Sequence, residues 1–425
     1  MRKTLIFALA LVPAIVLVGQ ARADEVGDLK KEVERQYDVL LKMQAKLLEL
    51  EEGQKKNSAA IAEAPTAAPA PGSLAEKLQW VEKLRISGDF RYRHENQDFD
   101  TRSDERDRHR IRARIKLEAD VADEWSLIFR LASGSSDSPT STNQTLGESG
   151  SGDGFSSKDI WLDLAYADWH PLDGLNVMFG KMDNPFYAVG KHQLIWDGDV
   201  TPEGIAAGYA FALSEATSAQ VTGGGFWLEE NSSGSDAAVW GVQGMLKHKL
   251  DDGSHIAGGA SYYDFVRLEG NAFSNLSQKG NTWTGGLYAY DYNILEAFGE
   301  YGFKIGDMPF GIYGTHITNT AGGADEDRAW ALGCTVNKAK NPGSWQFGYE
   351  YRDVEADAVV AGLSDSDFID GGTGGKGHRF SLAYQLTKNI QAGLTYFMAE
   401  RHDNRITGYD GQDMNLFQGD IVIKF

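Results

Sequence analysis

The chain has 425 residues, a formal net charge of −20, 49 glycines and a single cysteine. The acidic balance argues against a nucleic-acid-binding protein, because neutralising phosphates requires a basic surface, and one cysteine excludes a disulfide scaffold or a cysteine-rich metal site. A mean hydropathy of −0.38 and a single long apolar run exclude a polytopic helical membrane protein, since each such span needs about 20 apolar residues. The abundant glycine and aromatic residues favour a large antiparallel β-protein instead.

Residues 1–23 have the pattern of a bacterial secretory signal peptide. A positive start precedes an apolar run over residues 4–18, and small residues at Ala21 and Ala23 form a cleavage signal. We therefore expect the mature chain to begin at Asp24. An uncleaved membrane anchor is the alternative, and the shortness of the apolar run disfavours it.

Residues 24–57 show a heptad spacing that predicts a periplasmic α-helical coiled coil. All of the core positions except Gln36 are apolar, and charged residues fill most other positions, which is typical of a coiled coil that joins subunits. A lone amphipathic helix is the alternative. Residues 58–83 follow as an Ala/Pro-rich linker and a short helix that begins at a capping box. The predicted core positions are Val26, Leu29, Val33, Gln36, Leu40, Met43, Leu47 and Leu50.

From residue 84 the sequence alternates with period two, which is typical of β-strands that have two different faces. Phe90 and Tyr92 share an apolar face, and arginines alternate with them. Over residues 110–121 the apolar face includes Ile115, and the other face carries a row of cations. In a soluble sandwich the apolar face would form the core. In an outer-membrane barrel that face meets lipid and the charged face meets a wet lumen.

The order of the connections favours an outer-membrane barrel over a sandwich. Short and long connections alternate along the chain, as in bacterial barrels with short periplasmic turns and long outer loops, and an even strand count places both barrel ends on the periplasmic side. The predicted strands are 84–95, 108–121, 125–134, 158–169, 175–182, 204–213, 217–228, 237–249, 255–265, 294–305, 309–318, 327–338, 344–354, 378–387, 389–400 and 416–425. The predicted long loops are 135–157, 183–203, 266–293, 355–377 and 401–415.

The energetic cost of charge in lipid gives the same answer. An arginine or lysine that faces lipid at the midplane costs roughly 2–4 kcal/mol, so the cationic face of residues 110–116 must point to water. Residues 84–425 are therefore predicted to be an all-β, transmembrane antiparallel β-barrel of about 16 strands, wide enough for an aqueous channel. Aromatic residues near the ends of many predicted strands fit interfacial girdles.

Three segments resemble the putative porin family of Gram-negative bacteria, and more distantly anion-type porins. They are residues 84–93 (LRISGDFRYR), 175–186 (LNVMFGKMDNPF) and 196–204 (WDGDVTPEG), and the resemblance covers about residues 80–425. The terminal strand, which ends at Phe425, also resembles that of bacterial outer-membrane proteins. The resemblance implies a homotrimeric diffusion channel whose third outer loop folds inward.

Two groups of side chains are candidates for the pore chemistry. We expect the cations of the first two strands to line the pore, and the loop over residues 183–203 to form a constriction opposite them, where a transverse field would act on solutes. The alternative is that the cations are structural and pair with neighbouring acids such as Asp89 and Glu118. The predicted pore-lining residues are Arg85, Arg91, Arg93, Arg110, Arg112, Arg114 and Lys116, and the predicted constriction residues are Lys191, His192, Asp197, Asp199 and Glu203.

The predicted function is passive diffusion of small hydrophilic solutes or ions across the outer membrane, with no enzymatic activity, cofactor or metal. The cationic row argues for anions and the net charge argues for cations; because salt screens distant charges within about 8–10 Å, local charge favours mild anion preference. Expected partners are outer-membrane lipid and lipopolysaccharide, and the periplasmic N-terminal segment could bind peptidoglycan or a periplasmic partner. Two alternatives are an envelope anchor through the coiled coil and a barrel sheath around a multihaem cytochrome.

One acidic segment matches only part of a calcium-loop pattern. Asp365, Asp367 and Asp370 have a suitable spacing, but the final bidentate glutamate is missing. The segment is therefore interpreted as part of an ordinary acidic outer loop.

Overall fold

The structure is a computed structural model that describes residues 81–425, except 101–102, 136–137, 149–153, 277 and 402–410, together with seven helical residues between 35 and 52. The predicted signal peptide, the core positions of the predicted coiled coil and nearly all of the linker lie outside the described residues. The described barrel belongs to a compact unit formed by residues 79–425.

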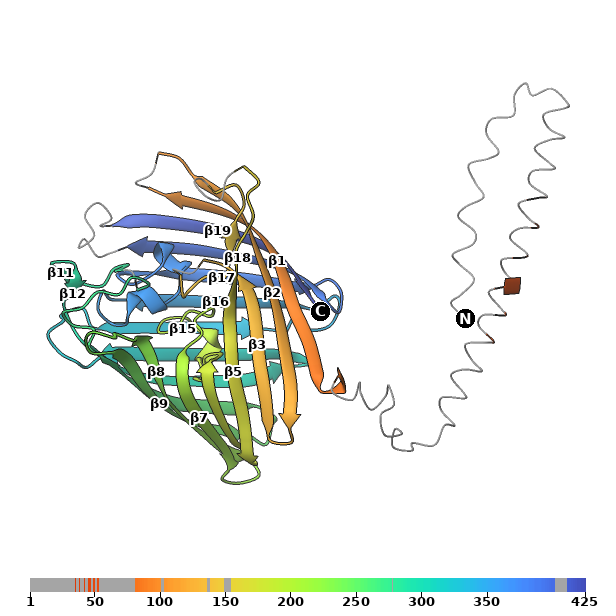
Figure 1. The fold of residues 1–425 in the computed structure, drawn as a ribbon, viewed down its shortest axis with the longest axis horizontal. Coiled ribbons are helices and arrows are strands. Elements are labelled where there is room, and N and C mark those ends of the chain that lie inside the picture. Colours follow the sequence, from red (N-terminus) through yellow and green to blue (C-terminus); the bar gives the residue numbers. More distant parts are fainter. Residues whose placement is uncertain are drawn as a thin grey trace, which may run out of the picture. The chain divides into compact units, whose positions relative to one another are not determined.

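Sixteen antiparallel strands form a closed barrel in the described part of the chain (Figure 1). Each strand pairs with its neighbours along the chain, and β1 closes the ring by pairing with β19 from Asp89 opposite Lys424 to Phe99 opposite Met414. The predicted number of strands and the antiparallel barrel are confirmed. The wall strands are β1 (Leu84–Phe99), β2 (Arg106–Ala122), β3 (Trp125–Ser133), β5 (Ile160–Leu172), β6 (Leu175–Lys181), β7 (Glu203–Ala212), β8 (Thr217–Glu229), β9 (Ala237–Lys249), β10 (His255–Val266), β13 (Tyr292–Ile305), β14 (Met308–Asn319), β15 (Arg328–Val336), β16 (Trp345–Val354), β17 (Gly375–Gln385), β18 (Ile390–Arg401) and β19 (Gln412–Lys424).

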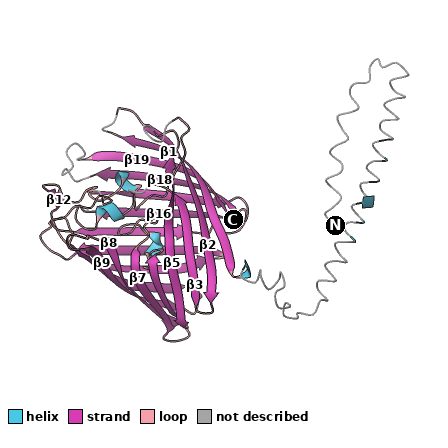
Figure 2. Cartoon of the chain, viewed as in Figure 1, coloured by secondary structure: helices cyan, strands magenta, loops and turns pink. Residues whose placement is uncertain are grey.

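The long connections contain the remaining short elements (Figure 2). These are β4 (Gln144–Thr145), which pairs with β2, the ribbon of β11 (Trp283–Thr284) and β12 (Leu287–Tyr288), and the 3₁₀ turns η1 (Val189–Lys191), η2 (Ala361–Leu363) and η3 (Phe368–Asp370). No helix among the described residues is long and apolar enough to cross a membrane.

The two faces of the wall differ as the alternation predicts. Phe90 and Ile115 are 40% and 50% exposed on the outer face, whereas Arg93, on the opposite face of β1, is only 6% exposed. A soluble sandwich would bury these apolar side chains and expose the cations. The observed arrangement leaves a wide apolar outer surface, which is stable only against hydrocarbon.

The main hydrophobic cluster includes residues of the long loops as well as of the wall strands. Leu194 and Ile195 pack with Val359 and Leu363 in this cluster, and wall residues such as Phe265 surround them. The predicted loop over residues 355–377, whose acidic segment is interpreted above as an ordinary outer loop, differs from that interpretation: residues 356–364 are buried. Its run of alanine, valine and leucine packs against the other loops instead of facing water.

Candidate functional site

The connection between β6 and β7, residues 182–202, is here called the inner loop, and it crosses to strands on another side of the barrel. Met182 N donates to Pro202 O at 2.9 Å and closes its base. Tyr187 donates its hydroxyl to Glu300 on β13 at 2.7 Å, and His192 Nε2 lies 3.0 Å from Oε1 of Glu296 on the same strand. These contacts hold the loop across the lumen.

A second loop, residues 355–374, meets the inner loop and is here called the docking loop. Asp197 N donates to Leu363 O at 2.7 Å, and Asp365 N donates to Gln193 O at 2.9 Å. Ser366 N also donates to Oδ2 of Asp197 at 2.8 Å. The two loops are thus joined through backbone groups as well as through one carboxylate.

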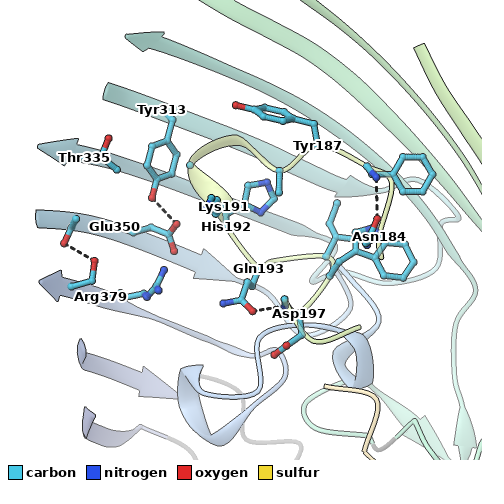
Figure 3. Close-up of a pocket in the computed structure, with 18 of the residues that line it drawn as sticks. Asn184, Tyr187, Lys191, His192, Gln193, Asp197, Tyr313, Thr335, Glu350 and Arg379 are labelled. Carbon is cyan, nitrogen blue, oxygen red and sulfur yellow. Dashed lines mark hydrogen bonds between the residues drawn. The ribbon is translucent and has the colours of Figure 1, made fainter. Parts of the chain in front are cut away.

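Two of the cavities beside these loops contain the charged groups of interest. The larger, of about 690 Å³, lies among Lys191, Tyr313, Glu350 and Arg379, whose arrangement is visible in Figure 3. The smaller, of about 300 Å³, has arginines of β1 and β2 on its wall and carboxylates of the two loops opposite them. Gln193, Asp197, Gly198 and Arg379 line both cavities. The smaller cavity is called the eyelet below, and its charged lining residues are Arg91, Arg93, Arg112, Arg114, Asp197, Asp199, Asp367 and Arg379.

The arginines of β2 in the eyelet share one carboxylate. Arg112 and Arg114 both donate to Asp89 of β1, at 2.8 Å and 2.7 Å. Arg114 also lies 3.7 Å from Oδ1 of Asp199 in the inner loop. The wall cations therefore face loop acids while being held in place by an acid of their own wall.

On β1, Arg93 is bound more tightly than Arg91. Arg93 donates to Asp420 of β19 at 2.7 and 2.8 Å, and to Asp367 of the docking loop at 3.3 Å. Among the described residues, the Arg91 side chain donates only to the neutral Oδ1 of Asn143, at 2.5 Å. The two neighbouring lumenal arginines thus differ in how much of their charge is neutralised.

Three predicted pore-lining cations border neither cavity and have structural partners. Arg85 is paired with Glu118 at 2.6 Å and with Asp120 at 2.5 Å, and Lys116 lies 3.3 Å from Glu118. Arg110 lies 3.4 Å from a buried carboxylate of β1, Glu95. The structural interpretation of the cationic row fits these three positions.

The predicted constriction residues have different positions. Lys191 is exposed to the larger cavity, and His192 is buried against Glu296. Asp199 accepts hydrogen bonds from N and Oγ1 of Thr142, each at 3.1 Å. Glu203 is the first residue of β7 and shares the outward face with Ile205, so it does not point into the lumen; it pairs with Lys181 at 2.8 Å. We leave Glu203 out of the constriction.

Asp197 occupies an unusual electrostatic position between the two loops. Its burial, together with the nearby Asp365 and Asp199, raises the pKa of the Asp197 carboxyl well above its ordinary value. The backbone N–H groups of Asp199 and Ser366 donate to the carboxylate and oppose this shift. Asp197 therefore takes up a proton more readily than an ordinary aspartate does.

Sequence reasoning missed the polar residues on the opposite wall. Glu350 accepts from Arg352 and, at 2.9 Å, from the hydroxyl of Tyr313, and Arg379 on β17 borders both cavities. β16 carries charges of both signs, and β17 has Arg379 and Lys376 on opposite faces, so neither strand forms a row of like charges such as that of β2. Glu350 and Arg379 both lie at lumen-facing positions of the predicted strands, and this alternation is the feature of the sequence that could have identified them.

The family comparison agrees with this architecture. Residues 100–286 and 288–425 match the family described as putative porin, which is well over half of the chain. The chain belongs to the putative porin family. No curated protein sequence matches the chain significantly.

Two solved porin structures align with the chain at low sequence identity. OprB of Pseudomonas putida, in a high-pH structure, aligns with a TM-score of 0.54 and 13% identity, covering 83% of this chain and 97% of that chain. OmpF of Salmonella typhi, in a complex with daunomycin, aligns with a TM-score of 0.48 and 12% identity, covering 80% and 97%. The likeness to OprB supports the barrel architecture of this family member.

Proposed function

We propose that the protein is an outer-membrane porin, a water-filled channel through which small hydrophilic solutes or ions diffuse passively. The observation that carries this proposal is the eyelet: a charged cavity of about 300 Å³ inside a barrel whose outer face is apolar. A lumen lined by arginines and aspartates holds water, because burying such charges in a dry core costs several kcal/mol each.

The eyelet places opposite charges on its two sides. Arg112 and Arg114 lie on the wall, while Asp197 and Asp199 lie on the inner loop. Fixed charges of opposite sign across a narrow aqueous passage create a transverse field, which orients dipolar solutes and selects among ions. We propose that this field makes the eyelet the selectivity-determining part of the channel.

The inner and docking loops favour a diffusion channel over a sheath around another protein. They are joined by two backbone–backbone hydrogen bonds and by one from Ser366 N to the Asp197 carboxylate, and their apolar side chains pack with wall residues. A multihaem cytochrome threaded through the barrel would have to displace both loops. The anchor function depends on the heptads at 24–57, whose predicted core positions lie outside the described residues.

We also propose, from the family resemblance, that the porin assembles as a homotrimer in lipid and lipopolysaccharide, with its N-terminal segment in the periplasm. The heptad segment would then join subunits or contact peptidoglycan or a periplasmic partner.

Planar-bilayer recordings test the channel. We expect the refolded protein to insert with stepwise increases in conductance, and a variant that lacks residues 24–72 to show steps of the same size. A correctly folded protein that inserts without conductance steps would show that the channel proposal is wrong. Loss of steps only in the truncated variant would favour the anchor or assembly function of the heptads.

A further inference from the structure

The cations that line the two cavities differ in whether a carboxylate neutralises them. Arg93, Arg112 and Arg114 each lie within 4.0 Å of at least one carboxylate. Among the described residues, Arg91 and Arg379 have no carboxylate within that distance. Uncompensated cations inside a lumen are the groups with which a passing anion exchanges its hydration shell.

Arg91 and Arg379 also have unused hydrogen-bond donors. The Nε atoms of both are buried and have no hydrogen-bond partner in the structure. Arg379 stacks over the ring of Phe397, with its Cζ 5.8 Å from the ring centroid, which fixes the plane of the guanidinium. Among the described residues, neither guanidinium has a full set of hydrogen-bond partners, so each keeps donor capacity for an acceptor that arrives in the eyelet.

The acids of the eyelet, in contrast, are already bound. Asp197 accepts from two backbone N–H groups, Asp199 accepts from Thr142 and lies near Arg114, and Asp367 accepts from Arg93. These acids therefore have less capacity left for a solute than the two arginines have. The imbalance favours a negatively charged solute.

We propose that Arg91 and Arg379 form a binding site in the eyelet for a small monocarboxylate. This site rests on the proposed channel function and names its preferred class of solute. The parallel N–H groups of a guanidinium match the two oxygens of a carboxylate in a bidentate contact. Asp197, Asp199 and Asp367 on the facing loops disfavour a dianion such as phosphate.

The larger cavity supplies a route to this site. The exposed side chain of Lys191 lines this cavity and makes no hydrogen bond or ion pair among the described residues, and Arg379 lines both cavities. An anion attracted to Lys191 next meets Arg379 and then Arg91 in the eyelet. Weak contacts in series permit both capture and release, as conduction requires.

Acetate, with acetamide as its neutral isostere, is the probe for this site. In bilayers with potassium chloride, acetate is expected to reduce chloride current through the native porin at concentrations at which acetamide does not. Arg91→Gln and Arg379→Gln should each weaken this block about tenfold or more, since a hydrogen bond to a charged group contributes about 1.5–3 kcal/mol. Arg85→Gln is the matched control, because Arg85 lies outside both cavities, and the block should not change.

Two further measurements separate the possible failures. Arg379→Lys keeps the positive charge but removes the planar guanidinium that can bind both oxygens of a carboxylate. Acetate block should therefore weaken while anion preference is retained. Broadening of the acetate methyl signal in NMR, measured with refolded protein in detergent, reports binding without conduction. Suppose that the native porin and the glutamine variants all show conductance steps, with equal acetate block and equal line broadening. This result would overturn the binding site but leave the channel proposal intact. Acetate line broadening that depends on Arg379, without any conductance steps, would overturn the channel and leave the site.

Discussion

At the scale of single residues, Gly190 shows how closely the inner loop approaches the wall. Its φ is 60°, in the left-handed region, and a Cβ added there would lie 2.2 Å from the ring of Tyr313. The ring cannot move freely, because its hydroxyl donates to Glu350 at 2.9 Å. Both the backbone conformation and the space at this position therefore require glycine.

Gly190→Ala is predicted to loosen the inner loop. The left-handed conformation alone costs a residue with a Cβ about 1–2 kcal/mol, and the contact with Tyr313 adds to this. We expect larger and noisier single-channel conductance in bilayers. Gly244→Ala on β9 is the control, because this glycine is exposed on the outer face and an added Cβ would meet nothing within 4 Å. Equal conductance in the two variants would contradict the close docking.

The raised pKa of Asp197 predicts a pH-dependent selectivity. As the pH falls from neutral toward the ordinary aspartate value near 4, Asp197 takes up a proton before exposed acids do, and the eyelet loses a negative charge. Anion preference, measured as the reversal potential in a salt gradient, should then rise. Asp197→Asn should lack the part of the change in reversal potential that comes from Asp197. The same pH dependence in the native protein and the variant would show that Asp197 does not control the selectivity.

The same shift determines the sign of the effect on stability. The folded protein binds the Asp197 proton more tightly than the unfolded chain does, so this group favours folding on the acid side of its raised pKa. Its contribution is lost as the pH rises through that pKa. Other carboxylates with lowered pKa values act in the opposite direction.

At the scale of elements, the docking loop depends on one side chain from the connection between β10 and β13. Asn281 is 0% exposed; its Nδ2 donates to Ala356 O and Val359 O at 2.7 and 2.8 Å, and its Oδ1 accepts from Ala361 N at 2.8 Å. One amide thus satisfies three buried backbone groups of another loop. The connection 267–291 therefore acts as a support for the docking loop.

Asn281→Ala should release the docking loop. Each buried backbone group left without a partner costs about 1–3 kcal/mol, so amide hydrogen exchange over residues 355–374 should accelerate strongly. Asn271→Ala is the control, because it removes a similar side chain whose hydrogen bonds to Arg267 O and Glu269 O are exposed. In this variant, amide exchange over residues 355–374 should change little. Unchanged protection in Asn281→Ala would mean that other contacts hold the loop.

At the scale of the whole molecule, the apolar outer face determines the environment in which the barrel is stable. Aromatic pairs lie next to short turns at the barrel end: the Trp125 and Trp169 rings are 5.3 Å apart, and those of Phe303 and Phe310 are 5.5 Å apart. Such girdles mark the interface between lipid and water. Ile115 lies near the middle of its strand, away from these ends.

Ile115→Arg should destabilise the barrel in phospholipid vesicles by roughly 2–4 kcal/mol, the cost of an arginine that faces lipid near the midplane. Urea unfolding in vesicles measures this difference, with Ile115→Leu as the apolar control. If the arginine variant were as stable as the leucine variant, the outer face would not be in contact with hydrocarbon.

The sequence alone was sufficient to predict the wall. Period-two alternation shows which side chains share a face, and the high cost of charge in lipid leaves only one orientation for the row from Arg110 to Lys116. Strand number and order follow from the same pattern, because each strand pairs with its neighbour along the chain across a short turn or a single loop. The structure confirms these features.

Only the tertiary structure decided how the lumen is filled and which charges remain free in it. Asp197 meets Ser366 across 169 positions of sequence, and Arg93 meets Asp420 across 327. Such contacts depend on loops that fold back into a closed ring, and no local period encodes them. Parity alone placed Arg91 and Arg93 alike in the lumen, but only the packed loops and the ring closure leave one guanidinium without a carboxylate and neutralise the other.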